Sequence, residues 1–296
     1  MDWRPRRLRG FLIGLGIVAG IVILDVLLVI WITHRPVDLF TFVLGLIIAL
    51  SLPALVLMAY WLYSLAGMRY TLERNGLIIT CGAAKQIIPM DSIRQIMPGA
   101  GRILEGRLRG VRWPGLWLGH GSLAGLGFTL FYATVPLDEQ LLVITPTLTY
   151  AISPGDTEAF VQAFDSRRQL GPLKRWLQES QQARFASWPI WSDRMGHVIL
   201  GLGLLLNASL FAYLCGRYPE LPPMVPLHFD ASGAVDRTGM RASLFILPTI
   251  GLLVWAGNGT LGVLLRAREH VAAYLLWCGT LLVQILLIVA VLTLLR

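Results

Sequence analysis

The sequence predicts a membrane protein, an α-helical bundle of five transmembrane helices with an inserted α+β domain. Three observations predict it. The 296 residues are 55% hydrophobic and only 14% charged, so the chain has too few solvating side chains to cover a water-soluble globule of its size. Long apolar runs lie towards both ends of the chain. A block patterned as short strands separates those runs.

Residues 1–66 are expected to form two transmembrane helices, at about 11–32 and 39–62. At 1.5 Å per residue, each apolar run can cross a hydrocarbon core of about 30 Å. The arginine-rich start, residues 1–10, leads into a run longer than a signal-peptide core and without a clear cleavage site. The first run is therefore predicted to be a retained signal-anchor helix.

Residues 197–296 are expected to supply three further transmembrane helices. Their predicted positions, again from apolar runs of sufficient length, are about 197–215, 244–265 and 271–295. The first two of these helices are separated by a polar loop rich in proline and turn residues, 216–243.

The chain's arginines predict its orientation. Ten arginines near the membrane lie on the side of the N-terminus and the strand-patterned block, against five on the other side. Cytoplasmic flanks carry the excess of positive charge in membrane proteins. The bias predicts a multi-pass protein of the bacterial inner membrane, with the N-terminus cytoplasmic and the C-terminus outside. Residues 169–196, polar with interspersed aromatics, are typical of an interfacial linker.

The strand-patterned block covers residues 67–168. Short β-branched and aromatic runs alternate with tight turns, and a helix with one apolar face is predicted from Thr157 onwards. Four glycines within the block superficially resemble a nucleotide cradle: Gly119, Gly121, Gly125 and Gly127. Phosphate binding by them is rejected because no GK[ST] follows and no strand-to-helix context is evident. The apolar residues around them, from Leu116 to Leu126, predict instead a flexible or membrane-touching excursion between strands.

Several elements of the block recur in a known family. They are Asn75-Gly76-Leu77-Ile78-Ile79 followed by Gly82, Ile88-Pro89-Met90 leading to Ile93, Trp113-Pro114-Gly115, and Ala151-Ile152-Ser153-Pro154 before a terminal helix. On these elements, residues 70–164 resemble the bacterial pleckstrin-homology-like (PH-like) domains. The resemblance covers about a third of the chain. It implies a bent, partly open antiparallel barrel closed by one C-terminal helix.

The polar loop carries a second, shorter pattern. Its residues are Pro226, His228, Phe229, Gly233, Asp236 and Gly239. With them the loop resembles a domain of uncharacterised function found in bacterial membrane proteins, including toxin-immunity and signalling proteins of the sporulation-delay type. The large cytoplasmic insert of this chain departs from the immunity proteins.

The same loop, with Asp230 added, is the predicted site for an external peptide or protein, since loops of fixed turn geometry often receive partners. His228, Asp230 and Asp236 together could bind a metal, because imidazole and carboxylate groups suit zinc. The pattern favours a structural loop instead, in which the two aspartates accept backbone N–H bonds around Gly233 and Gly239. No metal and no cofactor is therefore expected.

Asp25 lies inside the first predicted span, where an ionised carboxylate costs several kcal/mol unless it is paired or wetted. One hypothesis places it in a proton path. The other is a protonated or hydrogen-bonded side chain, with Asn207, Asn258 or Gln284 as its partner. Both stay open at this point.

A basic run accompanies the glycine-rich passage, with arginines at Arg94, Arg102, Arg107, Arg109 and Arg112. Near an anionic leaflet each charge could gain about 1 kcal/mol, and a plain solvated face is an equal alternative. The net charge of +8 is interpreted as cytoplasmic flanking charge that fixes the orientation of the membrane helices, so no nucleic-acid partner is expected.

The sequence shows no nucleophile elbow and no HExxH, so no enzyme activity is expected. It favours a sensing, scaffolding or regulatory membrane protein. Its partners would be the bilayer, a cytoplasmic protein or anionic lipid head groups at the PH-like domain, and an external partner at the loop. Two alternatives are a toxin-immunity protein and a proton-coupled transporter centred on Asp25.

Overall fold

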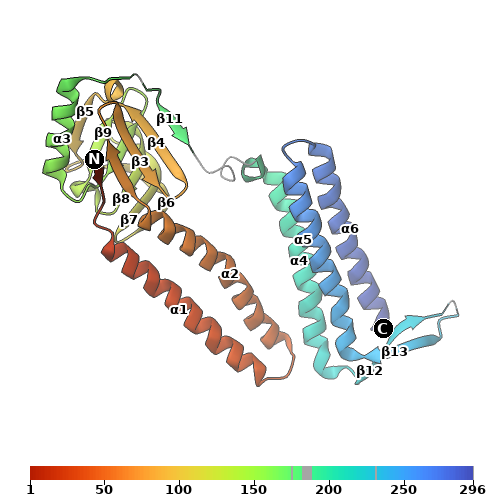
Figure 1. Cartoon of the computed structure of the whole chain (residues 1–296). Helices are drawn as coiled ribbons and strands as arrows, with labels where there is room; N and C mark the ends of the chain where they lie inside the picture. The colour runs from red at the N-terminus through yellow and green to blue at the C-terminus, as the bar shows by residue number, and fades with distance from the viewer. Residues whose placement is uncertain (175, 182–188, 231, 296) are drawn as a thin grey trace. The chain divides into compact units, whose positions relative to one another are not determined.

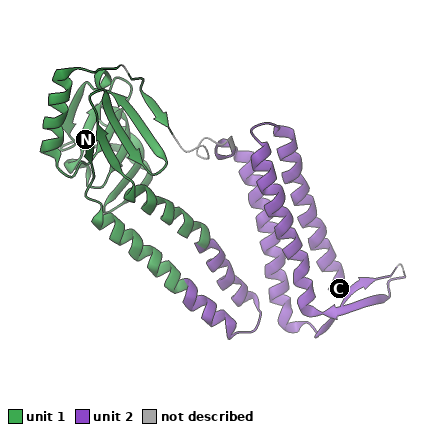
Figure 2. Ribbon diagram, in the orientation of Figure 1, with its two compact units in different colours: residues 1–24, 52–183 green, residues 25–51, 184–296 purple. Residues whose placement is uncertain are grey.

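The computed structural model describes residues 1–174, 176–181, 189–230 and 232–295 (Figure 1). The chain separates into two compact units, residues 1–24 with 52–183 and residues 25–51 with 184–296, and this boundary crosses the first two helices (Figure 2). The predicted interfacial linker lies partly outside the described residues, at 175 and 182–188.

Five of the described helices are long and apolar enough to cross a membrane. They are α1 (Leu8–Thr33), α2 (Leu39–Ala66), α4 (Arg194–Arg217), α5 (Ile246–Leu265) and α6 (His270–Leu294). Two short 3-10 segments adjoin these helices: η5 (Tyr218–Glu220) follows α4, and η6 (Arg241–Phe245) precedes α5. The predicted multi-pass architecture is confirmed.

The break between α1 and α2 ends in a reciprocal cap. Asp38 Oδ1 accepts a hydrogen bond from the Thr41 backbone N–H at 2.7 Å, and Thr41 Oγ1 accepts one from the Asp38 N–H at 2.9 Å. The two side chains thus satisfy amide groups that the first turn of α2 leaves without helical partners. The cap therefore fixes the residue at which α2 begins, Leu39.

The strand-rich domain between α2 and the linker holds two sheets, of six and five strands. The six-stranded sheet runs in the order β5 (Gln95–Pro98), β9 (Leu141–Ile144), β10 (Thr149–Ile152), β8 (Gly127–Ala133), β7 (Leu116–Leu123) and β6 (Leu104–Trp113). The five-stranded sheet runs in the order β1 (Asp2–Trp3), β2 (Arg69–Leu72), β3 (Gly76–Cys81), β4 (Ala84–Pro89) and β11 (Glu179–Gln181). Both outermost strands of the second sheet come from segments outside the predicted block.

Helix α3 (Thr157–Leu170) closes the domain, as the resemblance implied. The Asp156 carboxylate caps it by accepting a bond from the Ala159 N–H at 2.9 Å, and Gly171 ends it with φ +67°. Phe160 and Phe164 on its inner face are buried in a core that both sheets supply. The predicted strands-first, helix-last order is confirmed.

Two expectations for this domain were wrong. The glycine-rich passage is no excursion: β6 and β7 pair as an antiparallel hairpin, and Leu116, Trp117 and Leu123 are buried. Gly110 faces Gly119 across the pair, both with φ near +150°, and a side chain at either would meet the opposite backbone. The glycines therefore bring two strands close together. The second departure is β10, which runs parallel to β8 in an otherwise antiparallel arrangement.

Helices α4, α5 and α6 form a three-helix bundle. The Trp277 side chain of α6 is fully buried, and a side chain added at Gly196 or Gly262 would collide with its indole. Small residues let transmembrane helices approach closely because lipid gives no hydrophobic drive for their association. Glycines thus create the space that the largest buried side chain fills.

Candidate functional site

The strand-rich domain is joined to the start of α1 by a backbone contact. A side chain at Gly10 would collide with the Gly115 carbonyl, and one at Gly115 would collide with the Gly10 backbone. The Trp113 indole N–H donates to the Gly10 carbonyl at 3.2 Å, and its ring lies 5.9 Å from that of Trp61 near the end of α2. The Trp113-Pro114-Gly115 turn is thereby fixed on the helix pair.

The end of α2 adds further bonds at this junction. The Arg7 guanidinium donates to the Ala66 carbonyl, which ties the residue before α1 to the last residue of α2. The Cys81 thiol approaches the Ser64 carbonyl at 3.7 Å, and Cys81 belongs to the domain core. We call this set of contacts the junction.

A cavity of about 610 Å³ lies beside the junction. Arg6 and Arg9 line it from the segment that enters α1, and Arg112 lines it from the end of β6. The Arg112 guanidinium stacks over the Trp117 ring at 4.0 Å from the centroid. Glu139 is the one acidic residue among the lining side chains. We call this the junction cavity.

The five arginines predicted as one leaflet-contacting run are thus divided. Arg112 belongs to the junction cavity, whereas Arg107 and Arg109 line a separate hollow of about 730 Å³ with His120 and the exposed Phe128. Arg94 lies between η1 (Met90–Ser92) and β5, and Arg102 Nη2 lies 3.7 Å from the Met97 sulfur. The sequence missed Arg6 and Arg9 as partners of Arg112, because about a hundred residues separate them.

The polar loop forms a β-hairpin of β12 (Met224–Phe229) and β13 (Val235–Met240). Of the seven predicted loop residues, Asp230 and Gly233 lie in its turn and the other five lie in its strands. Asp230 Oδ1 accepts bonds from Ser232 Oγ at 2.6 Å, the Ser232 N–H at 2.8 Å and the Ala234 N–H at 2.9 Å. These bonds lower the pKa of Asp230, and the bond from Ser232 Oγ has the largest effect. Gly233 takes φ +84° in the same turn. Asp230 therefore has the structural role predicted for it.

Asp236 behaves differently from that prediction. Its Oδ1 lies 2.6 Å from His228 Nδ1 across the hairpin, so its recorded side-chain bond is to the imidazole and not to backbone N–H groups. Packing explains the glycine at position 239, since a side chain there would collide with Leu227. In the parts of the chain the structure describes, no group of three or more His, Cys, Asp or Glu side chains could hold a metal.

The base of the hairpin is attached firmly to the bundle. Val225, next to Pro226, is buried with Leu210, Leu214, Leu244 and Val291. The Arg241 Nη1 group donates to the carbonyls of Tyr218 at 3.2 Å and Leu221 at 3.1 Å, and its guanidinium lies 4.4 Å from the Tyr218 ring centroid. Phe229 and Val235, which flank the turn, are exposed, and so is Met240 at the base. The hairpin thus offers apolar side chains on a fixed base.

Asp25 is hydrogen-bonded to a neighbouring helix, as one of the two hypotheses had it, but its partner is none of the three residues named for it. Ser51 Oγ, on α2, donates to Asp25 Oδ2 at 2.6 Å. Two of the predicted partners bond within the three-helix bundle instead: Asn207 Nδ2 donates to Gln284 Oε1 at 3.1 Å and to the Pro248 carbonyl at 2.9 Å. Gln284 Nε2 donates to the Gly251 carbonyl at 2.8 Å. The role of Asp25 in proton movement stays a prediction.

A polar cluster that the sequence did not reveal lies where α4 begins. Asp193 accepts bonds from the Gly196 N–H at 2.9 Å, from Arg266 Nε at 2.5 Å and from the Tyr274 hydroxyl at 2.8 Å. Burial favours the protonated carboxyl, but the bonds outweigh it and lower the pKa of Asp193 to about 2. The cluster connects the start of α4, the end of α5 and the first turns of α6. Its only sequence signal is an Asp directly before an apolar run.

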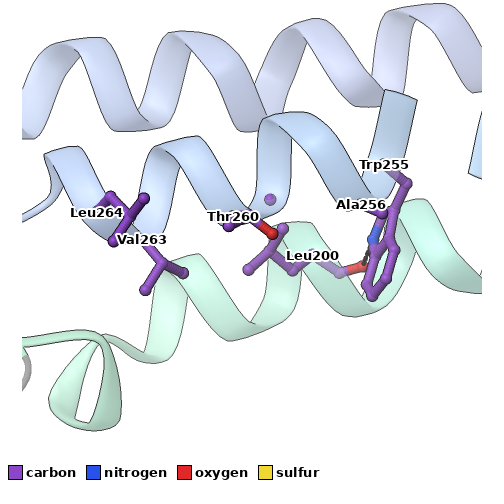
Figure 3. Close-up of a pocket in the computed structure, with 7 residues that line it drawn as sticks. Leu200, Trp255, Ala256, Thr260, Val263 and Leu264 are labelled. Atoms are coloured by element: carbon purple, nitrogen blue, oxygen red, sulfur yellow. Dashed lines mark hydrogen bonds between the residues drawn. The ribbon is translucent and has the colours of Figure 1, made fainter. Parts of the chain in front are cut away.

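Two further features are an apolar hollow in the bundle and a buried phenol in the strand-rich domain. An open hollow of about 430 Å³ between α4 and α5 is lined by Leu200, Val263, Leu264 and neighbours, and the Trp255 indole donates to the Leu200 carbonyl at 2.8 Å (Figure 3). In the strand-rich domain, burial raises the pKa of Tyr70, whose hydroxyl donates to the Tyr132 carbonyl at 2.6 Å. The phenol is a neutral structural donor, since it is fully buried.

Comparison with known proteins gives matches to parts of the chain. Residues 68–168 match the family model of a bacterial PH domain, and residues 204–252 match that of a domain of unknown function, DUF1648. An uncharacterized protein of Archaeoglobus fulgidus is 44% identical over 55 residues, which cover 19% of this chain and 30% of that protein's length. No solved structure is significantly similar. The strand-rich domain is therefore PH-like, and the second match includes the hairpin.

Proposed function

We propose that this chain is a non-enzymatic membrane protein that presents its PH-like domain at the cytoplasmic leaflet as a docking module for a cytoplasmic protein. In this proposal the β12–β13 hairpin lies on the opposite side and receives an external partner. The arginine bias supports the orientation, because the positively charged flanks of transmembrane helices stay on the cytoplasmic side. The role would be scaffolding or sensing.

One observation carries the proposal: the backbone contact between Gly10 and Gly115. If a flexible linker alone connected the domain to α1, the two backbones would not need glycines where they meet. Close backbone contact, with the Trp113 bond beside it, fixes the domain's height and direction relative to α1. Fixed presentation suits a docking module, because less orientational freedom is lost when a partner binds.

Strand β6 is the surface that favours a partner protein. It stands at the edge of the six-stranded sheet, with β7 as its one strand neighbour among the described residues. An exposed edge can pair with an extended segment of another chain. Arg107 and Arg109 are exposed along it. The matching partner is therefore an extended segment rich in acidic side chains.

The first experiment tests recruitment with the full-length chain. Cross-linking in cells, followed by purification, should recover a partner with the wild type and lose it when residues 70–168 are deleted. A sharper variant reverses the charge of the edge, Arg107→Glu with Arg109→Glu. Its matched control, Arg69→Glu with Arg94→Glu, reverses two exposed arginines elsewhere on the domain. Equal recovery from the edge variant and the wild type would sink the proposed surface.

A second experiment tests orientation. Reporters fused after Gly82 and after Gly233 should report opposite compartments, with the first cytoplasmic. The same compartment for both, or the reverse assignment, would overturn the proposed roles of the domain and the hairpin.

The exposed hairpin supports a second candidate function, reception of an external peptide or protein. Phe229, Val235 and Met240 are exposed although the hairpin base is firmly attached. Immunity against a membrane-active toxin is one form of this function. Expression of the chain should then protect a sensitive host, and replacing His228 and Asp236 should remove protection. Protection that survives both substitutions would exclude the hairpin as the determinant.

A further inference from the structure

The junction cavity gathers three arginines that form no ion pair among the described residues, although Arg6 also lines an adjoining hollow with Asp156 and Glu158. Arg6, Arg9 and Arg112 line it, and none of their guanidinium groups enters an ion pair or hydrogen bond recorded among the described residues. Glu139 alone opposes them among the lining side chains. Guanidinium groups bind phosphate oxygens well, because their N–H groups form a planar fork that can donate two bonds at once.

One of the three guanidinium groups is already positioned. Arg112 stacks on Trp117, a buried side chain of the neighbouring strand, with 4.0 Å between guanidinium carbon and ring centroid. Stacking uses the flat face of the guanidinium and leaves its edge, where the N–H groups lie, available for an anion. The Trp113-Pro114-Gly115 turn that follows is fixed on α1 by the Gly10 contact. The cavity wall is therefore held in place before any ligand binds.

The position of the cavity along α1 indicates where its ligand comes from. Helix α1 has 26 residues and so a length of about 39 Å, against a hydrocarbon core of about 30 Å. The apolar run that fills the core begins at Phe11, so the residues before it, from Leu8 to Gly10 with the charged Arg9 among them, are placed in the headgroup layer. Trp61 and Trp113 meet at the same level, which is typical of aromatic side chains at a membrane interface.

We propose that the junction cavity binds the phosphate of an anionic phospholipid from the adjacent leaflet. Arg6 and Arg9 approach the phosphate from the segment that enters α1, and Arg112 approaches it from the end of β6. The site lies partly outside the residues that match a PH domain, because Arg6 and Arg9 precede them. It is independent of the proposed protein partner, which uses Arg107 and Arg109.

The experiment uses the full chain, purified in a neutral detergent, and a fluorescent phosphatidylglycerol whose label accepts energy from tryptophan. A phosphatidylcholine with the same label and chains is the neutral comparison. The wild type should bind phosphatidylglycerol more tightly. The triple variant Arg6→Gln, Arg9→Gln, Arg112→Gln should lose that preference, at about five-fold in affinity for each arginine.

The matched control removes the same charge elsewhere on the domain: Arg94→Gln, Arg107→Gln and Arg109→Gln. It should retain the preference for phosphatidylglycerol. An equal loss in both triple variants would show diffuse attraction and overturn the site, as would a triple cavity variant that binds like the wild type. Glu139→Gln should tighten binding, since it removes the opposing carboxylate and changes an exposed residue. Weaker binding by this variant would count against the proposal.

Two further arms separate misfolding and a soluble ligand from lipid binding. The triple variant Arg6→Lys, Arg9→Lys, Arg112→Lys keeps the charge, so it should recover much of the preference for phosphatidylglycerol. A folded lysine variant that binds both lipids equally would count against a site that depends on charge. Inorganic phosphate and glycerol phosphate offer the same chemistry without acyl chains. They should displace the labelled lipid only weakly, and displacement at equal concentration would identify a site for free phosphate instead.

Discussion

The PH-like domain and the α4–α6 bundle are stabilised by opposite kinds of contact. The domain buries a continuous set of apolar side chains, including Phe160 and Phe164 of α3, between its two sheets. The bundle buries few of its large apolar side chains, and it also buries polar ones such as Asn207 and Gln284. Water drives apolar groups together in the first case. Lipid is as apolar as leucine, so in the second case the helices associate through close packing and hydrogen bonds.

The same contrast explains the glycines. In the domain, Gly110 and Gly119 allow two strands to approach with unusual backbone angles. In the bundle, Gly196 and Gly262 make room for Trp277, and Gly251 makes room for Asn207 and Gln284. Glycine thus allows unusual backbone angles in the domain, whereas in the bundle it lets helices pack closely.

The largest expected effect separates the two regions by truncation of an apolar side chain. Phe160→Ala should destabilise the PH-like domain by about 3–5 kcal/mol, because it leaves a cavity in a core that water-driven burial stabilises. Leu253→Ala removes an apolar side chain that is 67% exposed on α5 and should cost under about 0.5 kcal/mol. Thermal unfolding and limited proteolysis in one detergent measure both. Equal losses would show that the bundle also depends on apolar burial.

The next effect comes from the cluster at the start of α4. Asp193→Asn keeps a helix-capping side chain but removes the charge opposite Arg266, and should destabilise the bundle by about 1.5–3 kcal/mol. The control is Glu220→Gln, which removes the partner of Arg217 in a pair whose side chains are 48% and 64% exposed. That pair should contribute about 0–1 kcal/mol. A control loss as large as that of Asp193→Asn would remove the distinction between buried and exposed charge.

The charge of Asp193 also predicts a pH dependence. Its pKa falls from 3.8 to about 2 on folding, so the folded state binds the proton less readily than the unfolded state. The stabilisation is therefore complete above about pH 4 and is lost as the pH falls towards 2. The difference in unfolding temperature between wild type and Asp193→Asn should shrink over this interval. A difference that stays constant down to pH 2 would mean that the charge is not the source.

The sequence predicted those parts of the fold that depend on local patterns. Apolar runs of sufficient length marked the five membrane helices, and alternation with tight turns marked most strands of the domain. It misjudged β6 and β7, since glycines such as Gly110 and Gly119 interrupt the alternation and resemble a loop. It also gave no sign of β1, because a strand of two residues has no period of its own.

The sites were predictable to the extent that their residues are close in the chain. Asp230 and Gly233 share one turn, and their structural role follows from turn chemistry. Arg9 and Arg112 line the same cavity because Gly10 packs against Gly115, a contact between backbones that no residue pattern signals. Asp193 gains its partners from two other helices. Contacts of this kind require the folded chain.

The smallest expected effect tests the polar contacts inside the bundle. Gln284→Leu removes the acceptor of Asn207 and the donor to the Gly251 carbonyl, but Asn207 keeps its bond to the Pro248 carbonyl. Hydrogen bonds between membrane helices contribute about 0.6 kcal/mol on average and about 1.7 at most, so the loss should lie in that range. Thr293→Val, which alters a bond within α6, is the control. Unfolding of the reconstituted chain measures both. A loss of several kcal/mol in the free energy of unfolding would mean that a few polar bonds supply most of the bundle's stability. No loss would mean that the stability comes from packing, such as that of Trp277 against glycine.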